Sequence, residues 1–499
     1  MSEEISMSLA AKLRFLIIAG VGLFSDGYLN IVIGLVVPMI GYLYFPKGSV
    51  PAIQGAEIKG ALSIGMVVGQ LGFGLFGDAL GRHKVYGKEL IFTIFGTLMV
   101  VLLPWKGMSH SSIITWLAIW RTVSGVGIGG DYPMSSALAA EKSMFGSRAK
   151  RILSVFACIG VGGFTSSIVN TILIVAAKSA VDRDIRALEW VWRLLLGLGV
   201  IPAALTLYAR LTMSETKPYQ NYVAKETGLS SSGSHTRGLK EQFADFNEYF
   251  KEPKHGRTLF AVSAVWFLYD IAFYGINYNQ SIILNKIGYG KGATPYETLY
   301  NTAIGNIIVQ AAGYLPGFFI GIFLADWMGR VRQQFIFCVL TSILYAIWAG
   351  VSTRPDTPVG GLMTLFTISQ LVLNAGPNCT TFLLPAEVFP TRVRGTAHGI
   401  AAASGKAGAI LTAYAFATIV EKIGLAGVLG LFSGIMALAA AITLMIPETK
   451  GLTIDDIEHD RMYSKSLDAS RADDSQLSTP STIMKGSDLG VVVPVIEKA

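Results

Sequence analysis

The stretch DALGRHK at residues 78–84 recurs in the second half of the chain as DWMGRVR at residues 326–332. Both copies read Asp-x-x-Gly-Arg-x-basic, and each follows an apolar run at the same place in its half. Such a repeat indicates two related halves that move around a central site. The aspartate can accept hydrogen bonds from a helix N-terminus, and the arginine can bind acidic groups. Basic loops that only set topology would not need the whole motif twice. We therefore assign a gating role to Asp78, Gly81, Arg82, Asp326, Gly329 and Arg330.

The composition around these motifs is that of a membrane protein. Of 499 residues, 52% are hydrophobic and only 15% are charged, whereas soluble domains are about a quarter charged. The apolar residues form runs of roughly 20, enough for a helix to cross about 30 Å of hydrocarbon. The 55 glycines suit closely packed transmembrane helices. The sequence therefore predicts an all-α membrane protein, with the lipid bilayer as its main partner.

Apolar segments and loop charges predict the domain organisation. Twelve spans are expected at 13–43, 58–77, 86–104, 112–138, 152–177, 190–210, 258–284, 300–324, 334–351, 361–384, 396–420 and 425–446. Basic loops after spans 2, 4 and 10 predict that both termini and the central linker are cytoplasmic. The expected regions are an N-terminal segment (1–12), a six-helix half (13–213), a linker (214–257), a second half (258–446) and a flexible polar tail (447–499). The net charge of +7 then reflects topology, and no nucleic-acid partner is expected.

Five ionisable residues fall inside apolar runs: Asp26, Arg121, Asp131, Asp270 and Lys406. A charge facing lipid is costly, so each should face a central cavity or a partner. A cation that attracts an anion, together with a carboxylate that carries a proton, is what a proton-coupled anion carrier needs. Arg121 precedes Asp131 by ten residues, about 15 Å along a helix. We therefore expect Arg121 to pair with Asp26 instead.

Two of these residues have informative neighbours. Asp270 lies between Trp266 and Tyr274 at helical spacing, so the three share one helix face. An aromatic stripe alone usually means packing, but a carboxylate in its middle favours a cavity-facing site. Lys406 lies within SGKAG at 404–408, where small neighbours leave room for a ligand or another helix. Its depth in the span argues against a lysine that merely reaches to the membrane surface.

The chain from about residue 10 to 450 resembles a major facilitator superfamily transporter, on the paired loop motif and PETKG at 447–451. GGDYPMS at 129–135, WFLYDIAFYG at 266–275 and GPN at 376–378 resemble motifs of the phosphate:proton symporters of fungi and plants. The resemblance implies a multi-pass plasma-membrane symporter with two six-helix halves. It implies substrate contacts from Tyr132, Trp266, Asp270, Tyr274, Asn378 and Lys406, and a proton route through Asp26, Arg121, Asp131 and Asp270.

Two departures from that family bear on the cargo. Ile159 stands where those carriers have a phosphate-binding glutamine, and Leu29 stands where they have a second carboxylate. Losing a donor to a charged oxygen costs on the order of 1.5–3 kcal/mol, which penalises bare phosphate more than a phosphodiester. DGYLN at 26–30 also resembles the fungal glycerophosphodiester permeases. We therefore expect import of glycerophosphoinositol or glycerophosphocholine, with inorganic phosphate as the alternative.

Other functional classes are weaker. The long linker and Ser-rich tail would suit a phosphate transceptor, and PETKG would suit a sugar uniporter, although neutral sugars need no intramembrane charges. No Ser-His-acid set, metal cluster or phosphate-binding loop is evident in the sequence. We therefore expect a transporter that is not an enzyme, has no cofactor or metal and works as a monomer on a small phosphate-bearing anion and protons.

Overall fold

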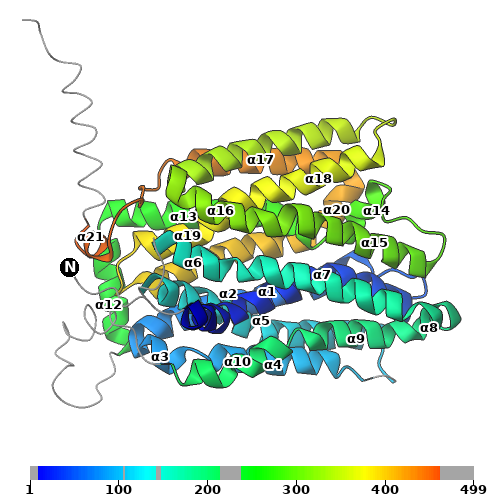
Figure 1. Cartoon of the computed structure of the whole chain (residues 1–499), viewed down its shortest axis with the longest axis horizontal. Coiled ribbons are helices and arrows are strands. Elements are labelled where there is room, and N and C mark those ends of the chain that lie inside the picture. Colours follow the sequence, from blue (N-terminus) through cyan, green and yellow to red (C-terminus); the bar gives the residue numbers. More distant parts are fainter. Residues whose placement is uncertain (1–8, 105–106, 142–147, 214–237, 461–499) are drawn as a thin grey trace, which may run out of the picture.

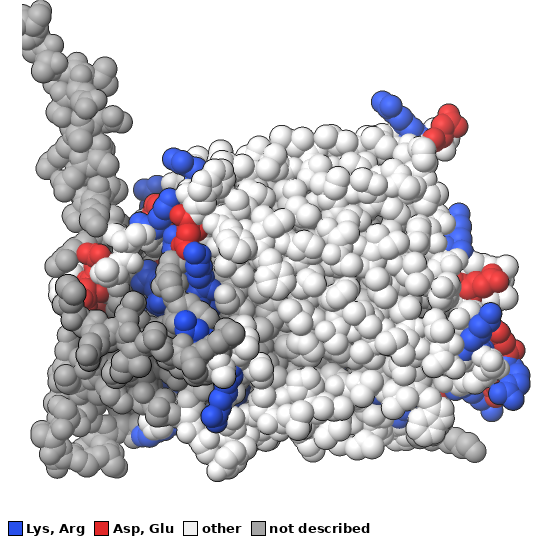
Figure 2. All heavy atoms as spheres, in the orientation of Figure 1, with Lys and Arg blue, Asp and Glu red and all other residues white. Residues whose placement is uncertain are grey.

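A computed structural model describes residues 9–104, 107–141, 148–213 and 238–460. Within these ranges every regular element is a helix, which confirms the all-α class. The long helices run along one common direction (Figure 1). Charged side chains gather at the two ends of the visible face and leave a broad uncharged belt between them (Figure 2). Ten helices of the described chain are long and apolar enough to cross a membrane.

The first half consists of long helices joined by short ones. Its elements are α1 (Leu9–Tyr44), α2 (Ala52–Leu80), α3 (Arg82–Val85), α4 (Lys88–Val101), α5 (His110–Glu141), α6 (Arg148–Phe156), α7 (Cys158–Ala176), α8 (Lys178–Arg183), η1 (Ile185–Ala187), α9 (Leu188–Leu198) and α10 (Ile201–Leu211). The α6–α7 and η1–α10 segments each form one apolar span, over 148–176 and 185–211.

The second half repeats this pattern. Its elements are α13 (Pro253–Asn277), α14 (Gln280–Lys286), α15 (Pro295–Val309), η3 (Gln310–Tyr314), α16 (Leu315–Met328), α17 (Arg330–Ser352), α18 (Val359–Leu373), η4 (Asn374–Asn378), α19 (Cys379–Val388) and α20 (Arg394–Thr443). The segments η3 and η4 are single π-helical turns, a feature that often occurs at functional sites.

Two elements account for the difference between the twelve expected spans and the ten helices that meet the length and hydropathy requirements. Helix α4 has 14 residues, fewer than the roughly 20 that a perpendicular helix needs. Helix α20 has 50 residues, and Gly424 inside it adopts φ 72°, which divides it between the two last expected spans. The number of membrane crossings therefore stays a prediction.

The GVGIGG run at 125–130 lets α5 approach α2 closely. A Cβ atom added at Gly125 would lie 2.1 Å from the carbonyl oxygen of Leu62, and one at Gly129 would lie 2.3 Å from that of Met66. Close backbone contact at small residues is how membrane helices associate. The glycines that lead up to Asp131 thus serve packing.

Two short helices lie at one end of the bundle (Figure 1). Helix α12 (Leu239–Phe250) belongs to the expected linker, and α21 (Ile454–Glu458) to the expected tail. Residues 448–460 differ from the flexible tail that we expect. The Thr449 hydroxyl donates to Glu387 at 2.7 Å, and Glu458 accepts from the Thr391 amide at 2.7 Å. The rest of the expected tail, most of the linker and residues 1–8 lie outside the described residues.

Candidate functional site

A buried cavity lies where the two halves meet, with walls from α1, α5, α6, α7, α13, η3, η4 and α20. All seven residues expected to touch substrate line it: Tyr132, Ile159, Trp266, Asp270, Tyr274, Asn378 and Lys406. Asp26 also lines it, whereas Arg121 and Asp131 do not. Its free volume of about 20 Å³ holds about one water molecule. The structure is therefore closed around the side chains of the site, and a larger ligand requires the halves to separate.

Lys406 on α20 is the one cation among the residues that line this cavity. Its Nζ donates to Asp270 Oδ2 and to the Tyr274 hydroxyl, both at 2.9 Å. It also lies 4.4 Å from the centre of the Tyr274 ring, a cation–π distance. A Cβ atom at Gly405 would lie 2.4 Å from Trp266 Cδ1 and 2.9 Å from Asp270 Oδ2. The glycine before Lys406 thus makes room for Trp266 and Asp270 themselves.

Asp26 enters the same cavity from α1 with neutral partners. Tyr132 donates its hydroxyl to Asp26 Oδ2 at 2.5 Å, and the Asn30 side-chain amide donates to Oδ1. The Asn30 oxygen accepts in turn from the Tyr278 hydroxyl at 2.9 Å. Leu29 is buried but does not line the cavity. Asn30, one helical turn after Asp26, is the residue that contacts the Asp26 carboxylate. Leu29 therefore does not determine the polarity of the cavity.

The expected pair between Arg121 and Asp26 is wrong. The Arg121 Nε donates to the carbonyl oxygen of Ile58 at 2.9 Å, and Asp26 is occupied by Asn30 and Tyr132. The prediction paired the two residues from their positions along their helices. Such positions do not determine the direction in which either side chain points.

Asp131 belongs to an ion-pair cluster inside the first half. Its Oδ1 accepts from Arg210 and, at 2.9 Å, from Ser135, while the same Arg210 nitrogen donates to Glu89 at 2.9 Å. Both carboxylates and the guanidinium are fully buried. We missed Glu89 and Arg210, because charges near the ends of apolar segments are usually taken as loop charges. Asp131 therefore lies away from the substrate cavity, one residue from Tyr132, which faces it.

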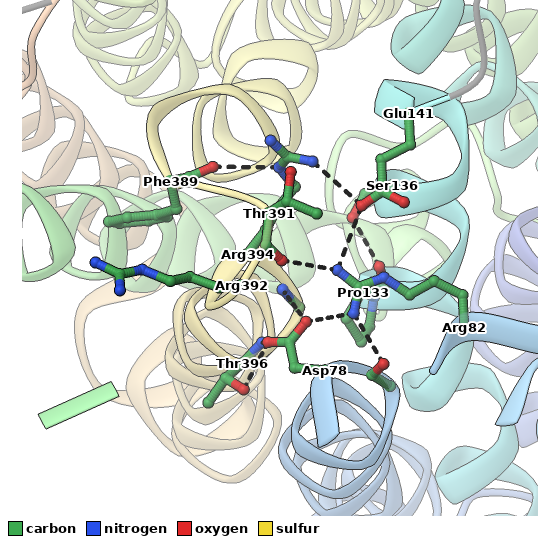
Figure 3. A network of polar contacts seen from close by, with 12 residues as sticks. Asp78, Arg82, Pro133, Ser136, Glu141, Phe389, Thr391, Arg392, Arg394 and Thr396 are labelled. Carbon is green, nitrogen blue, oxygen red and sulfur yellow. Dashed lines mark hydrogen bonds and ion pairs between the residues drawn. The ribbon is translucent and has the colours of Figure 1, made fainter. Parts of the chain in front are cut away.

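The first copy of the repeated motif joins the two halves at the α12 end of the bundle (Figure 3). Asp78 accepts from the amides of Gly395 at 3.1 Å and Thr396 at 2.6 Å, at the N-terminus of α20. Arg82 donates to Asp78 at 2.5 Å and to Glu141 at 3.3 Å. An acidic cap on a helix N-terminus is favourable, so Asp78 holds α2 against α20, and Arg82 connects this contact to Glu141 of α5.

The second copy makes a related junction. Arg330 donates to Glu387 Oε2 at 2.8 Å, and Arg148 of the first half donates to Glu387 Oε1 at 3.1 Å. Asp326 lies 3.7 Å from Lys150 of the first half. Gly81 and Gly329 have φ of 98° and 91°, a region that favours glycine, which explains why both copies of the motif have glycine at this position.

The acidic partners of these arginines were missed, although the sequence carries a signal for them. Glu141 and Glu387 each follow an alanine and lie three residues beyond the fourth expected span of their half. Glu448 of the PETKG stretch accepts from the backbone amides of Arg330 and Val331, both at 3.1 Å. A search for repeated acids, not only for the repeated Asp-x-x-Gly-Arg, would have found the first two.

One further cluster has the right ligand types for a metal ion. Atoms of Glu252, His255 and Asp460 lie within 4.8 Å of one another. Lys254 lies 2.8 Å from Glu252 and 3.4 Å from Asp460. Partial burial raises the pKa of Asp460, but His255 and Lys254 lower it more, so the net pKa lies below the usual range. These contacts neutralise the acids, and we interpret the cluster as a tie between the tail and α13.

Two helical halves around a buried polar site, closed at one end by paired Asp-x-x-Gly-Arg loops, are the architecture of the major facilitator transporters. The fold matches that of the proton:xylose symporter XylE with a TM-score of 0.67 over 90% of this chain and 99% of that one, at 20% identity. The chain belongs to the sugar (and other) transporter family, whose model matches residues 15–460.

The names of relatives within the family point to a class of substrate. A Schizosaccharomyces pombe protein (C1683.01), provisionally named an inorganic phosphate transporter, is 38% identical over 91% of this chain and 89% of its own. The Saccharomyces cerevisiae inorganic phosphate transporter PHO84 is 34% identical over 95% of this chain and 89% of its own. The expected closeness to glycerophosphodiester permeases is not supported, because these names agree with the phosphate alternative. The departures at Ile159 and Leu29 therefore do not indicate a phosphodiester cargo.

Proposed function

We propose that this protein is a proton-coupled importer of inorganic phosphate in the plasma membrane. The observation that carries the proposal is the Lys406 ammonium, buried in the cavity between the halves and shared by Asp270 and Tyr274. A cation at this depth is expensive unless it pairs or binds a ligand. The names of the relatives support phosphate as that ligand.

The arrangement suggests how anion and proton are coupled. An incoming phosphate takes hydrogen bonds from Lys406, Tyr274 and Asn378, so that Asp270 loses its share of the lysine charge. A buried carboxylate without its cation is strongly unfavourable, and taking up a proton removes that cost. Anion binding and protonation therefore favour each other, which is the requirement for symport.

Asp26 is the second proton acceptor in this proposal. Its partners Tyr132 and Asn30 are neutral donors, so a proton on Asp26 leaves no unpaired cation behind. Tyr132 is in position to turn its hydroxyl from Asp26 to a phosphate oxygen. Release then requires the contacts of Asp78 with α20 and of Arg148 with Glu387 to open. The twelve crossings, the cytoplasmic termini and a monomeric unit belong to the same proposal.

Uptake into proteoliposomes tests the cargo directly. The purified protein should accumulate labelled phosphate faster when the outside is acidic, and excess glycerophosphocholine or glycerophosphoinositol should compete poorly. The Lys406→Met variant is the matched control for leak and for binding elsewhere. Strong competition by the diesters, or uptake of labelled diester that exceeds phosphate uptake, would restore the glycerophosphodiester hypothesis.

A further inference from the structure

A second cavity opens between the halves at the end of the bundle opposite α12 and α21. It has a volume of about 300 Å³ and lies between α1 and α2 of the first half and α14 and α15 of the second. Among its polar lining residues are Ser49, Lys59, Asn279, Ser281 and Thr298. Lys59 is the one charged side chain among the residues that line it. We call this space the vestibule.

Lys59 is buried at the wall of the vestibule with 8% of its surface exposed. Its Nζ donates to Asn279 Oδ1 at 2.8 Å, a contact between the two halves. Within the described chain no carboxylate forms an ion pair with Lys59. A buried cation that has only a neutral amide as partner keeps most of its desolvation cost. A ligand of opposite charge would remove that cost.

Arg121 adds a second cation of this kind. It is 3% exposed, and its Nη2 has no hydrogen-bond partner in the described chain. Its Nε donates to the carbonyl of Ile58, the residue next to Lys59. Arg121 of α5 therefore lies against the stretch of α2 that carries Lys59.

Tyr278 separates the vestibule from the central cavity, because it lines both. Its hydroxyl donates to Asn30 at 2.9 Å and lies 2.8 Å from the Ser63 hydroxyl. Asn30 in turn contacts Asp26. A hydrogen-bonded wall of neutral side chains thus stands between Lys59 and the Lys406 site, and it can open without breaking an ion pair.

We propose that Lys59 forms an anion-capture site in the vestibule, where a small oxyanion waits before it passes Tyr278 to Lys406. The anion replaces Asn279 as the partner of Lys59, which removes one contact between the halves at this end. The identity of the anion as phosphate, and the assignment of this end to the outside, rest on the proposed function. The presence of Lys59 and the absence of acidic residues in the vestibule lining do not depend on the proposed function.

Thiol labelling tests the site without reference to transport. Ser49 lines the vestibule and is exposed, so Ser49→Cys reports on the local charge. We expect a sulfonate-bearing methanethiosulfonate to react faster than a trimethylammonium one, and Lys59→Gln to lower that rate ratio about tenfold. Lys59→Arg should restore it. Lys291→Gln, at an exposed position outside the lining, is the matched control. A ratio that Lys59→Gln leaves unchanged would overturn the site.

Phosphate uptake then tests the role of the site. Lys59→Gln should raise the KM for external phosphate about tenfold at low ionic strength and leave the maximal rate within about twofold. Asn279→Ala keeps Lys59 and should keep the labelling ratio, which guards against a folding defect in the lysine variants. A lowered labelling ratio with an unchanged KM would overturn capture on the phosphate route. If the unmutated protein carries no phosphate, the proposed function fails, while labelling still decides whether the vestibule selects anions.

Discussion

Asp26 and Asp270 face the same cavity from opposite halves, yet they are held in different ways. Asp270 shares its charge with Lys406 at 2.9 Å, whereas Asp26 accepts hydrogen bonds from Tyr132 and Asn30 and forms no ion pair in the described chain. When an anion binds Lys406, Asp270 loses the charge of its ion-pair partner, whereas Asp26 loses only the neutral hydrogen bond from Tyr132. The comparison separates a carboxylate that is ion-paired with the substrate-binding lysine from one that is held by neutral donors.

The largest effect should come from removing the cation. Lys406→Met leaves two buried carboxylates without a positive charge, a loss of about 3–5 kcal/mol for a broken buried pair. We expect uptake of labelled phosphate to fall at least about 100-fold, with Lys406→Arg retaining more activity. Surface expression and size-exclusion profiles separate this from misfolding. Uptake that survives in a well-folded Lys406→Met protein would show that the anion binds elsewhere.

Asp26→Asn should reduce uptake less than Lys406→Met, and it tests whether Asp26 differs from Asp270. The amide keeps an oxygen for Tyr132 but cannot take a proton, so concentrative uptake driven by an acidic exterior should fall about tenfold while phosphate exchange at equal concentrations persists. Both fluxes can be followed in the same proteoliposomes. Equal loss of exchange and of concentrative uptake would mean that Asp26 acts in binding and not in coupling.

At the α12 end, Glu387→Gln should loosen the contact between the halves. Glu387 is buried and receives Arg148 and Arg330, so we expect the open form at this end to gain about tenfold in population. Accessibility of a cysteine at Tyr132 to a thiol reagent from that side measures this change. Lys150→Gln removes a half-exposed contact at 3.7 Å and is the control, with an expected effect below about 1 kcal/mol. Similar effects of the two variants would contradict the closing role of Glu387.

The smallest expected effect is a gain in the apparent affinity for phosphate. Ile159 lines the cavity without contributing a donor, so Ile159→Gln should add one hydrogen bond to phosphate and lower its KM by several-fold, given about 1 kcal/mol for such a bond. Ile159→Leu keeps the apolar character and should change little. A raised KM in the glutamine variant would indicate that the anion does not approach Ile159.

Some of this site follows from the sequence, because helical spacing and burial leave few choices. Trp266, Asp270 and Tyr274 share a face at intervals of four residues, and all three line the cavity. The partners of charged residues were harder to foresee. Arg210 meets Asp131 and Glu89 across three helices, and Arg148 meets Glu387 across the two halves. Such pairs depend on how remote helices rotate about their axes, which the pattern of one sequence does not contain.

The coupling between Lys406 and Asp270 is the central claim, and proton movement with phosphate tests it most directly. Proteoliposomes held at about pH 5 on both sides, below the second ionisation of phosphate, carry a pH-sensitive dye inside. Addition of phosphate should acidify the interior for the unmutated protein. Asp270→Asn should exchange labelled phosphate through the retained Lys406 but give a much weaker acidification, because only Asp26 can then take up a proton. Acidification equal to that of the unmutated protein in Asp270→Asn would contradict the account.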